Sequence, residues 1–280
     1  MNVMVIGSGT MGSGIAQVLA ANNHKVVLRD LSEESLNKGM NLIEKNLSKN
    51  VQKGKLSEEQ KQIILDNIVT STDIELAKDC DLVIEAIVEN MEIKKELFKQ
   101  LDEICKEETI LATNTSSLSI TEISVSTSRP DKVIGMHFFN PVPVMKLVEV
   151  IDGQLTSKET HKKIEELTKQ INKTPVTVSE APGFVVNRIL VPMINEAVGI
   201  LADGVASVED IDNAMKLGAN HPIGPLALAD LIGNDVCLAI MEVLYDEFKD
   251  SKYRPHPHLK KMVRSGLLGR KSKQGFYDYK

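Results

Sequence analysis

Short apolar runs that alternate with amphipathic stretches predict alternating strands and helices over the first half of the chain. Residues 3–6 and 26–28 form two such runs, and the stretch between them has a helical pattern as far as Ala20. Further apolar runs lie at residues 82–87, 109–112 and 133–136, separated by helical segments such as 92–105. Strands that alternate with helices form a mainly parallel sheet with covered faces, so the predicted fold class is α/β.

A long polar stretch at residues 34–67 interrupts this alternation after the second strand. Gly54 divides the stretch, and Ser57 followed by Glu58 and Glu59 is a typical helix start. We therefore predict a helical hairpin inserted between two strands.

The pattern changes again after His137. Residues 138–143 contain two prolines, and strands are expected at 146–151 and 175–178, where the sheet could end in an antiparallel manner. Beyond the Ala-Pro-Gly sequence at 181–183 we expect helices, with no strand before 276–279. These patterns predict two domains, residues 1–182 and an all-helical part at 183–280.

The helix expected at residues 184–201 is apolar around most of its circumference and contains Pro192, which should kink it. Such a helix needs cover on several sides. Neighbouring helices of the same domain or a second subunit could provide that cover, and the sequence leaves both alternatives open.

Composition narrows the class of protein. The chain has 280 residues, of which 42% are hydrophobic and 26% charged, as in an ordinary globular protein. Its net charge of -6 argues against nucleic-acid binding, and no apolar run is long enough to span a membrane. The opening residues read directly as a strand, so no targeting segment is expected. The three cysteines form no CxxC pair, which favours reduced thiols over a disulfide or metal framework and a cytoplasmic location.

A glycine motif joins the first strand to the first helix. Residues 7–12 read Gly-Ser-Gly-Thr-Met-Gly: Gly7 permits a tight turn, Gly9 lets the backbone approach a pyrophosphate, and Gly12 lets the helix pack on the strand. Asp30 follows the second strand, where it could accept hydrogen bonds from the ribose of NAD. The order predicts a Rossmann-type dinucleotide-binding unit, although Arg29 beside Asp30 could receive the 2′-phosphate of NADP.

Three candidate site residues lie at or beyond strand ends. Ser116 belongs to a run of five small polar residues, 113–117, after the strand at 109–112, and this run could equally cap the next helix. His137 follows an apolar strand, where an imidazole could exchange a proton near neutral pH. Asn187 lies in the first turn after the domain boundary, where it could reach a substrate oxygen or form a local cap.

Glu149 lies on the strand after His137, and period-2 alternation puts it on the same face as Leu147. If the chain reverses between the two strands, Glu149 could reach His137 and fix its tautomer. The alternative is a carboxylate that pairs with Lys146 or lies exposed on a sheet edge.

The predicted insertion carries lysines at helical spacing. Lys45, Lys49 and Lys53 share one face, Lys55 follows, and no acidic residue lies between Lys45 and Lys55. The group is either a local anion site or a solvated helix face.

Five motifs together resemble the 3-hydroxyacyl-CoA dehydrogenase family over essentially the whole chain, and its short bacterial members in particular. They lie at residues 7–12, 114–118 (Asn-Thr-Ser-Ser-Leu), 137–143 (His-Phe-Phe-Asn-Pro-Val-Pro), 182–188 (Pro-Gly-Phe-Val-Val-Asn-Arg) and 275–277 (Gly-Phe-Tyr). The resemblance implies a Rossmann-type N-terminal domain, a helical C-terminal domain for substrate binding, and a homodimer formed through that second domain.

The resemblance also implies roles for individual residues. His137 would be the general acid and base and Glu149 its orienting carboxylate, while Ser116 and Asn187 would bind the reacting oxygen of the substrate. Lys49 and Lys53 would hold the phosphates of coenzyme A. The implied cofactor-binding residues are Gly7, Gly9, Thr10, Met11, Gly12, Asp30, Glu89, Lys94, Asn140 and Lys271.

The expected reaction is reversible hydride transfer between a nicotinamide cofactor and C3 of a short-chain (S)-3-hydroxyacyl-CoA, interconverting acetoacetyl-CoA and 3-hydroxybutyryl-CoA. NAD is the favoured cofactor and NADP stays open; no metal is expected. Two alternatives remain: a dehydrogenase of a small free hydroxy acid, and a non-catalytic dinucleotide-binding protein of the same fold.

Overall fold

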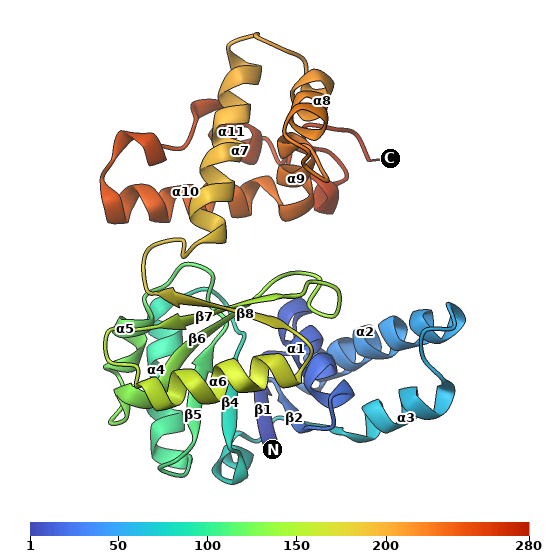
Figure 1. Ribbon diagram of the computed structural model, residues 1–280, viewed down its shortest axis with the longest axis vertical. Helices are drawn as coiled ribbons and strands as arrows, with labels where there is room; N and C mark the ends of the chain where they lie inside the picture. Colours follow the sequence, from blue (N-terminus) through green and yellow to red (C-terminus); the bar gives the residue numbers. More distant parts are fainter. Residues whose placement is uncertain (280) are drawn as a thin grey trace. The chain divides into compact units, whose positions relative to one another are not determined.

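The computed structural model describes residues 1–279, and the chain divides into two compact units, residues 1–180 and the part that begins at Ala181. Figure 1 shows the sheet and helices of the first unit and the helices of the second. Each unit is described by itself below. No helix of residues 1–279 has the length and apolar character required to cross a bilayer.

One eight-stranded sheet forms the centre of the first unit, in the order β3-β2-β1-β4-β5-β6-β7-β8. The strands β1 to β6 run parallel, β7 is antiparallel to β6, and β8 is parallel to β7. The strands are β1 (Asn2–Ile6), β2 (Lys25–Arg29), β3 (Ile68–Ser71), β4 (Leu82–Glu85), β5 (Ile110–Thr113), β6 (Val133–Phe138), β7 (Leu147–Asp152) and β8 (Thr174–Ser179). The predicted α/β class and the mainly parallel sheet are thus confirmed.

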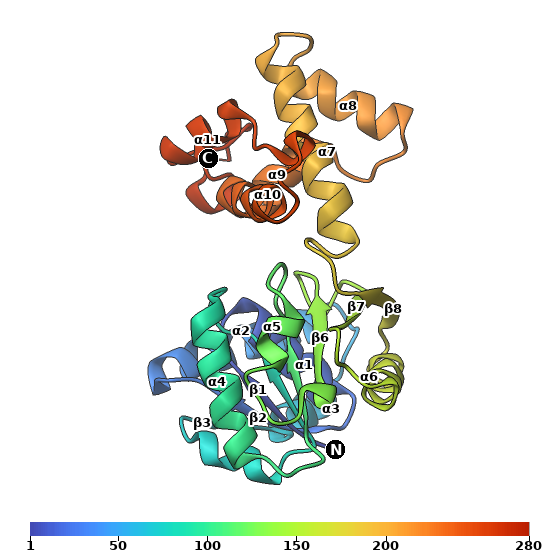
Figure 2. The same ribbon diagram turned by 90° about the vertical axis from the view of Figure 1, so that its left-hand side faces the viewer.

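Helices cover both faces of this sheet (Figure 2). Ile15 of α1 and Ile164 of α6 belong to one core cluster on one face, while α4 and α5 lie on the other. The helices of the unit are α1 (Thr10–Ala21), α2 (Glu33–Gln52), α3 (Glu58–Asp66), α4 (Met91–Ile104), α5 (Ile120–Ser124) and α6 (Lys158–Gln170), with short 3-10 turns η1 (Ile74–Asp79) and η2 (Pro130–Lys132). Burial on both faces explains why the central strands are continuous apolar runs.

The predicted insertion is present as the helix pair α2 and α3 between β2 and β3. Ser57 caps α3 through a capping box with Gln60, so the start signal read from the sequence is a real helix start. Strand β3, which closes the insertion, lies at the sheet edge with Val69 exposed, and the sequence pattern did not predict it.

The second unit is helical around its own core, which includes Val191 and Ile194 of α7 and Leu244 of α10. Its helices are α7 (Val186–Ala202), α8 (Val208–Gly218), α9 (Pro225–Ile232), α10 (Asn234–Phe248) and α11 (Pro257–Arg264), with 3-10 turns η3 (Ser251–Tyr253) and η4 (Arg270–Ser272). Helix α7 begins two residues later than predicted, because Gly183 and Phe184 have φ values of 74° and 50° and turn the chain first.

The prediction of a strand at residues 276–279 is wrong. The segment forms isolated bridges only, and its polar groups bond to buried carboxylates instead of a neighbouring strand. Asp230 accepts hydrogen bonds from the backbone of Phe276 and Tyr277, and Asp212 accepts one from the Tyr277 hydroxyl. A Cβ atom at Gly275 would lie 1.9 Å from the Asp230 Oδ1 atom, which explains a glycine at that position.

Candidate active site

The glycine motif forms a tight turn between β1 and α1. Gly7 has φ 101°, and a Cβ atom on Gly12 would lie 1.7 Å from the Gly7 carbonyl oxygen. Helix α1 begins at Thr10, and the N-cap residue Gly9 has no side chain that could accept a hydrogen bond from the first turn. The N–H groups of Thr10 and Met11, like those at any helix start, have no acceptor within the helix. A turn of this kind suits the pyrophosphate of a dinucleotide, which N–H groups and a positive helix end would bind.

Asp30 lies at the carboxyl end of β2, beside this turn. Its Oδ2 atom accepts hydrogen bonds from the Ser8 amide and hydroxyl, both at 2.7 Å, and its Oδ1 atom accepts one from the Leu31 amide at 2.7 Å. Burial alone would raise the pKa of Asp30, but these bonds and the charge of Arg29 hold it below its ordinary value. The ionised carboxylate is suited to accept from ribose hydroxyls. Arg29 directs its Nε atom to the Thr72 carbonyl, 3.3 Å away.

His137 and Glu149 form a buried pair on the two antiparallel strands. They are directly opposite each other in the β6–β7 register, and the His137 Nδ1 atom lies 2.8 Å from the Glu149 Oε2 atom. His137 is 6% exposed and Glu149 is 0% exposed. In the tautomer in which Nδ1–H donates to the Glu149 carboxylate, Nε2 is the ring nitrogen that can exchange a proton with a ligand. The alternative in which Glu149 pairs with Lys146 or lies exposed is wrong.

Ser116 lies after β5 and is bound by Glu89 from the loop after β4. The Glu89 Oε1 atom accepts from the Thr115 hydroxyl at 2.7 Å, and from the Ser116 amide and hydroxyl at 2.8 and 3.1 Å. The alternative role of this run as a helix cap is wrong, because Ser119 caps α5. Burial would raise the pKa of Glu89, but Lys94 and these hydrogen bonds hold it below its ordinary value.

Lys94 is nearly completely buried, at 1% exposure of its side chain, and lies between two carboxylates. Its Nζ atom is 2.5 Å from Glu85 and 3.3 Å from Glu89. Sequence reasoning missed Glu85, which ends β4 at 0% exposure. The available signal was an acidic residue inside an apolar run, which needs a cationic partner.

Asn140 is exposed on the loop between β6 and β7, before a cis peptide bond to Pro141. Sequence reasoning also missed the residue that holds this loop. The Lys173 Nζ atom donates to the carbonyl oxygens of Val142 and Met145, both at 2.6 Å. Burial lowers the pKa of Lys173. The loop that separates His137 from Glu149 is thus fixed by a buried cation.

The lysines of the insertion are placed as predicted on α2 and just beyond its end. Lys45, Lys49 and Lys53 are all exposed, and within residues 1–279 none of them forms an ion pair. Their side chains are accessible to an anion.

Two site candidates belong to the second unit. Asn187 lies in the first turn of α7, as expected, and has interactions within the protein. Lys271 lies in η4, where its Nζ atom is 2.5 Å from a carboxylate oxygen of Asp235.

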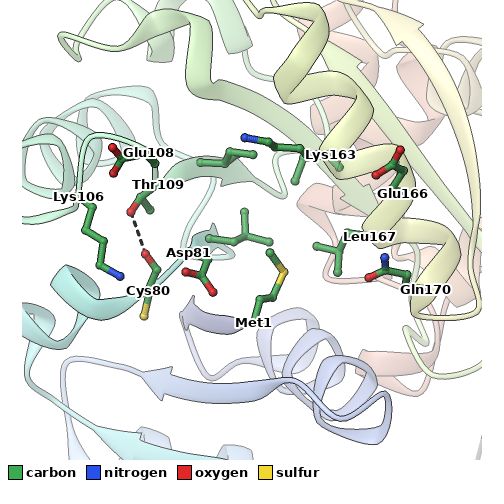
Figure 3. A pocket seen from close by; sticks show the side chains of 13 residues that line it. Met1, Cys80, Asp81, Lys106, Glu108, Thr109, Lys163, Glu166, Leu167 and Gln170 are labelled. Carbon is green, nitrogen blue, oxygen red and sulfur yellow. Dashed lines mark hydrogen bonds between the residues drawn. The ribbon is translucent and has the colours of Figure 1, made fainter.

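Figure 3 shows the side chains that line a cavity of about 400 Å³. The cavity lies at the amino ends of the strands, whereas the glycine turn lies at the carboxyl end of β1. Met1, Asp81 and Thr109 line it, and these residues precede β1, β4 and β5. Thr109 uses its hydroxyl to bond the Cys80 carbonyl oxygen. Ligands of open α/β sheets bind at the carboxyl ends of the strands, so this cavity is at the wrong edge for the dinucleotide.

The three cysteines are buried free thiols. Burial raises the pKa of Cys80 and Cys105 to about 11 each and that of Cys237 to about 12, so none is a ready nucleophile. Within residues 1–279, no group of three or more His, Cys, Asp or Glu side chains could hold a metal ion.

Comparison with known proteins identifies the family of the chain. Residues 2–181 match the family model described as "3-hydroxyacyl-CoA dehydrogenase, NAD binding domain", and residues 183–279 match "3-hydroxyacyl-CoA dehydrogenase, C-terminal domain". The chain therefore belongs to the 3-hydroxyacyl-CoA dehydrogenase family, an NAD-binding family of oxidoreductases.

Individual relatives cover the whole chain. A 3-hydroxybutyryl-CoA dehydrogenase of Clostridioides difficile is 67% identical over 100% of this chain and 99% of its own length. The mitochondrial hydroxyacyl-coenzyme A dehydrogenase of Homo sapiens is 47% identical over 100% of this chain and 91% of its own length. The crystal structure of (S)-3-hydroxybutyryl-CoA dehydrogenase PaaH1 from Ralstonia eutropha has a TM-score of 0.96 at 53% identity, covering 100% of this chain and 99% of that one.

Proposed function

We propose that this protein catalyses reversible hydride transfer between NAD and C3 of (S)-3-hydroxybutyryl-CoA, which interconverts that thioester and acetoacetyl-CoA. The observation that carries the proposal is the buried pair of His137 and Glu149, with 2.8 Å between the His137 Nδ1 and Glu149 Oε2 atoms. Relatives of high identity over their full length are 3-hydroxybutyryl-CoA dehydrogenases, which supports the same substrate here.

His137 is the proposed general acid and base. In the oxidative direction its Nε2 atom takes the proton of the substrate hydroxyl, and in the reductive direction it returns that proton. Glu149 holds Nδ1–H and stabilises the imidazolium that forms. NAD, when bound, supplies the hydride acceptor at its nicotinamide ring.

Ser116 and Asn187 are the proposed donors to the reacting oxygen. Their hydroxyl and amide groups would stabilise the negative charge that develops on this oxygen as the proton leaves. The bond from the Ser116 amide to Glu89 supports this role, because it fixes the loop, and the Ser116 hydroxyl would turn from Glu89 to the substrate oxygen when the substrate binds.

The remaining site residues divide between the cofactor and the coenzyme A group. We propose that Lys49 and Lys53 bind the phosphates of coenzyme A, since both are exposed and outside ion pairs among the described residues. The proposed cofactor residues are Gly7, Gly9, Thr10, Met11, Gly12, Asp30, Glu89, Lys94, Asn140 and Lys271. The ionised Asp30 favours NAD over NADP, because a carboxylate repels a 2′-phosphate.

We further propose a homodimer formed through the helical unit and a cytoplasmic location. Several large apolar side chains of this unit are exposed, among them Ile189 at 68%, Leu217 at 86% and Leu231 at 51%, which supports a partner surface. The three free thiols support a reducing compartment.

Steady-state kinetics with four oxidant and cofactor pairs tests the proposal. The oxidants are acetoacetyl-CoA and free acetoacetate, each with NADH and with NADPH, and NADH consumption is expected with acetoacetyl-CoA only. Turnover of free acetoacetate at a similar kcat/KM would favour a dehydrogenase of small hydroxy acids. Cofactor binding without turnover of any 3-oxoacyl-CoA would favour a non-catalytic protein of this fold.

A further inference from the structure

A buried carboxylate that the proposed mechanism does not use lies at the end of β4. Glu85 accepts three hydrogen bonds: its Oε1 atom from the Ile87 amide at 2.7 Å and from Lys94 at 2.5 Å, and its Oε2 atom from the Thr113 hydroxyl at 2.6 Å. The Ile87 amide, the Lys94 ammonium and the Thr113 hydroxyl can all donate to this carboxylate, so its surroundings suit the ionised form.

Glu85, Lys94 and Glu89 form one cluster with two negative charges and one positive charge. Lys94 bridges the two carboxylates, at 2.5 Å from Glu85 and 3.3 Å from Glu89. The side chains of Glu85 and Lys94 are 0% and 1% exposed, whereas 37% of the Glu89 side chain is exposed. Counted at formal charges, the cluster carries one net negative charge, and its buried part, Glu85 with Lys94, lies where charges interact more strongly than they do in water.

The cluster lies beside the crevice that takes the dinucleotide. The strand order reverses between β1 and β4, and dinucleotides bind across the carboxyl ends of the strands at such a reversal. The glycine turn approaches the end of β4 closely, because a Cβ atom on Gly7 would lie 2.5 Å from the Ala86 carbonyl oxygen. Glu85 immediately precedes Ala86 and ends β4, so its charge is next to this crevice.

The nicotinamide ring of the oxidised cofactor carries a positive charge, and that of the reduced cofactor is neutral. A fixed negative charge near the ring stabilises the first form relative to the second. We propose that Glu85 is a positioning residue whose buried charge, held by Lys94 and shared with Glu89, makes this protein prefer the oxidised cofactor. The inference rests on the proposed function in requiring NAD at this edge of the sheet.

The test compares dissociation constants of NAD⁺ and NADH in the free protein and in the Glu85→Gln variant. The amide keeps the size of the side chain and removes its charge. We expect the ratio of the NAD⁺ to the NADH dissociation constant to rise about threefold to tenfold. Tenfold corresponds to two unit charges about 12 Å apart at an effective dielectric constant of about 20. Calorimetry measures NAD⁺ binding, and the fluorescence of NADH measures NADH binding.

Two further variants separate charge from packing. Glu122→Gln removes a carboxylate on α5 that pairs with Lys95 at 3.0 Å, and it should leave the ratio unchanged. Glu89→Gln removes the same unit of charge from the partly exposed end of the cluster, so it should raise the ratio even if Glu85→Gln fails to fold. Contacts to the ribose are the same for both cofactor forms, so their loss cancels in the ratio.

The outcomes distinguish this inference from the proposed function. If the wild-type protein binds neither form, the proposed function is wrong. If it binds both and the ratio stays within twofold in Glu85→Gln and Glu89→Gln, the inference alone is overturned. Equal weakening of both forms would assign Glu85 a structural role without influence on the preference.

Discussion

The pair of His137 and Glu149 gives the sharpest prediction about catalysis. Glu149→Gln keeps the shape of the side chain and removes its charge, so the imidazolium formed during the reaction loses its counter-ion. The buried position of both residues means that water cannot replace the lost carboxylate. We expect a large loss of kcat with intact cofactor binding.

The size of this loss follows from the distance between the two groups. The His137 Nδ1 and Glu149 Oε2 atoms are 2.8 Å apart, which places the centres of charge roughly 4 Å apart. At an effective dielectric constant of about 20, charges at this separation interact by about 4 kcal/mol. A barrier raised by that amount lowers kcat about 10³-fold. The glutamine amide can also favour the wrong tautomer of the ring, which acts in the same direction.

The same strand supplies a matched control. Asp152 of β7 pairs with His161, and its Oδ1 atom lies 2.7 Å from the His161 Nδ1 atom, but 33% of the Asp152 side chain is exposed. Asp152→Asn therefore makes the same chemical change to a carboxylate–imidazole pair three residues along β7. It should leave kcat within about twofold of the wild type.

The assay is the rate of NADH oxidation at saturating acetoacetyl-CoA, together with the NADH dissociation constant and the thermal unfolding temperature. A folded Glu149→Gln variant that binds NADH normally and retains more than about a third of the wild-type kcat would refute the electrostatic reasoning. An equal loss in Asp152→Asn would point to damage to β7 instead.

Three other predictions concern binding of the coenzyme A group, the loop between β6 and β7, and the pH dependence of stability. Replacing Lys49 and Lys53 by glutamate reverses their charges and should raise KM for acetoacetyl-CoA about tenfold, while KM for a small thioester analogue stays unchanged. If the variant and the wild type have the same KM for acetoacetyl-CoA, the lysines form a solvated helix face. Lys173→Met removes two charge-assisted hydrogen bonds and should lower the free energy of unfolding by about 2 kcal/mol in urea, whereas an unchanged value would show that its burial cost cancels them. Burial alone would raise the pKa of Asp102, but hydrogen bonds and Arg129 hold it below 3.8. The free energy of unfolding of the wild type should therefore exceed that of Asp102→Asn by about 1–2 kcal/mol above about pH 5, and this difference should decrease as the pH falls toward 3. Urea unfolding at several pH values measures the difference. A difference that does not change with pH would contradict the lowered pKa of Asp102.

Local sequence patterns predicted the parts of the fold that are locally determined. The glycine turn and the capped start of α3 at Ser57 depend on residues within a few positions of each other. The contact between His137 and Glu149 was also predictable, because one chain reversal places the two residues opposite each other. The roles of the site residues stay predictions until they are measured.

Partners that are distant in the sequence explain what was missed. Lys173 reaches the Val142 carbonyl oxygen 31 residues away, and nothing in the local sequence of either residue indicates this bond. The alternating pattern of residues 276–279 is typical of a strand, but the segment bonds to Asp230, which lies 46 residues before Phe276. The apolar run at 82–87 hid Glu85, because the run was read as one strand although β4 ends at that residue.

The reversal of one strand explains how a buried acid can face the proposed base. The parallel neighbour of β6 is β5, which ends at Thr113 opposite Gly135, so this strand has no residue opposite His137. Strand β7 runs the other way: it begins at Leu147, near the end of β6, and Glu149 is its third residue, buried and opposite His137. The loop between β6 and β7 must then return the chain within a few residues, and Lys173 holds that loop through two carbonyl oxygens. The antiparallel strand therefore brings the two side chains opposite each other, and the buried lysine stabilises the loop that makes this reversal.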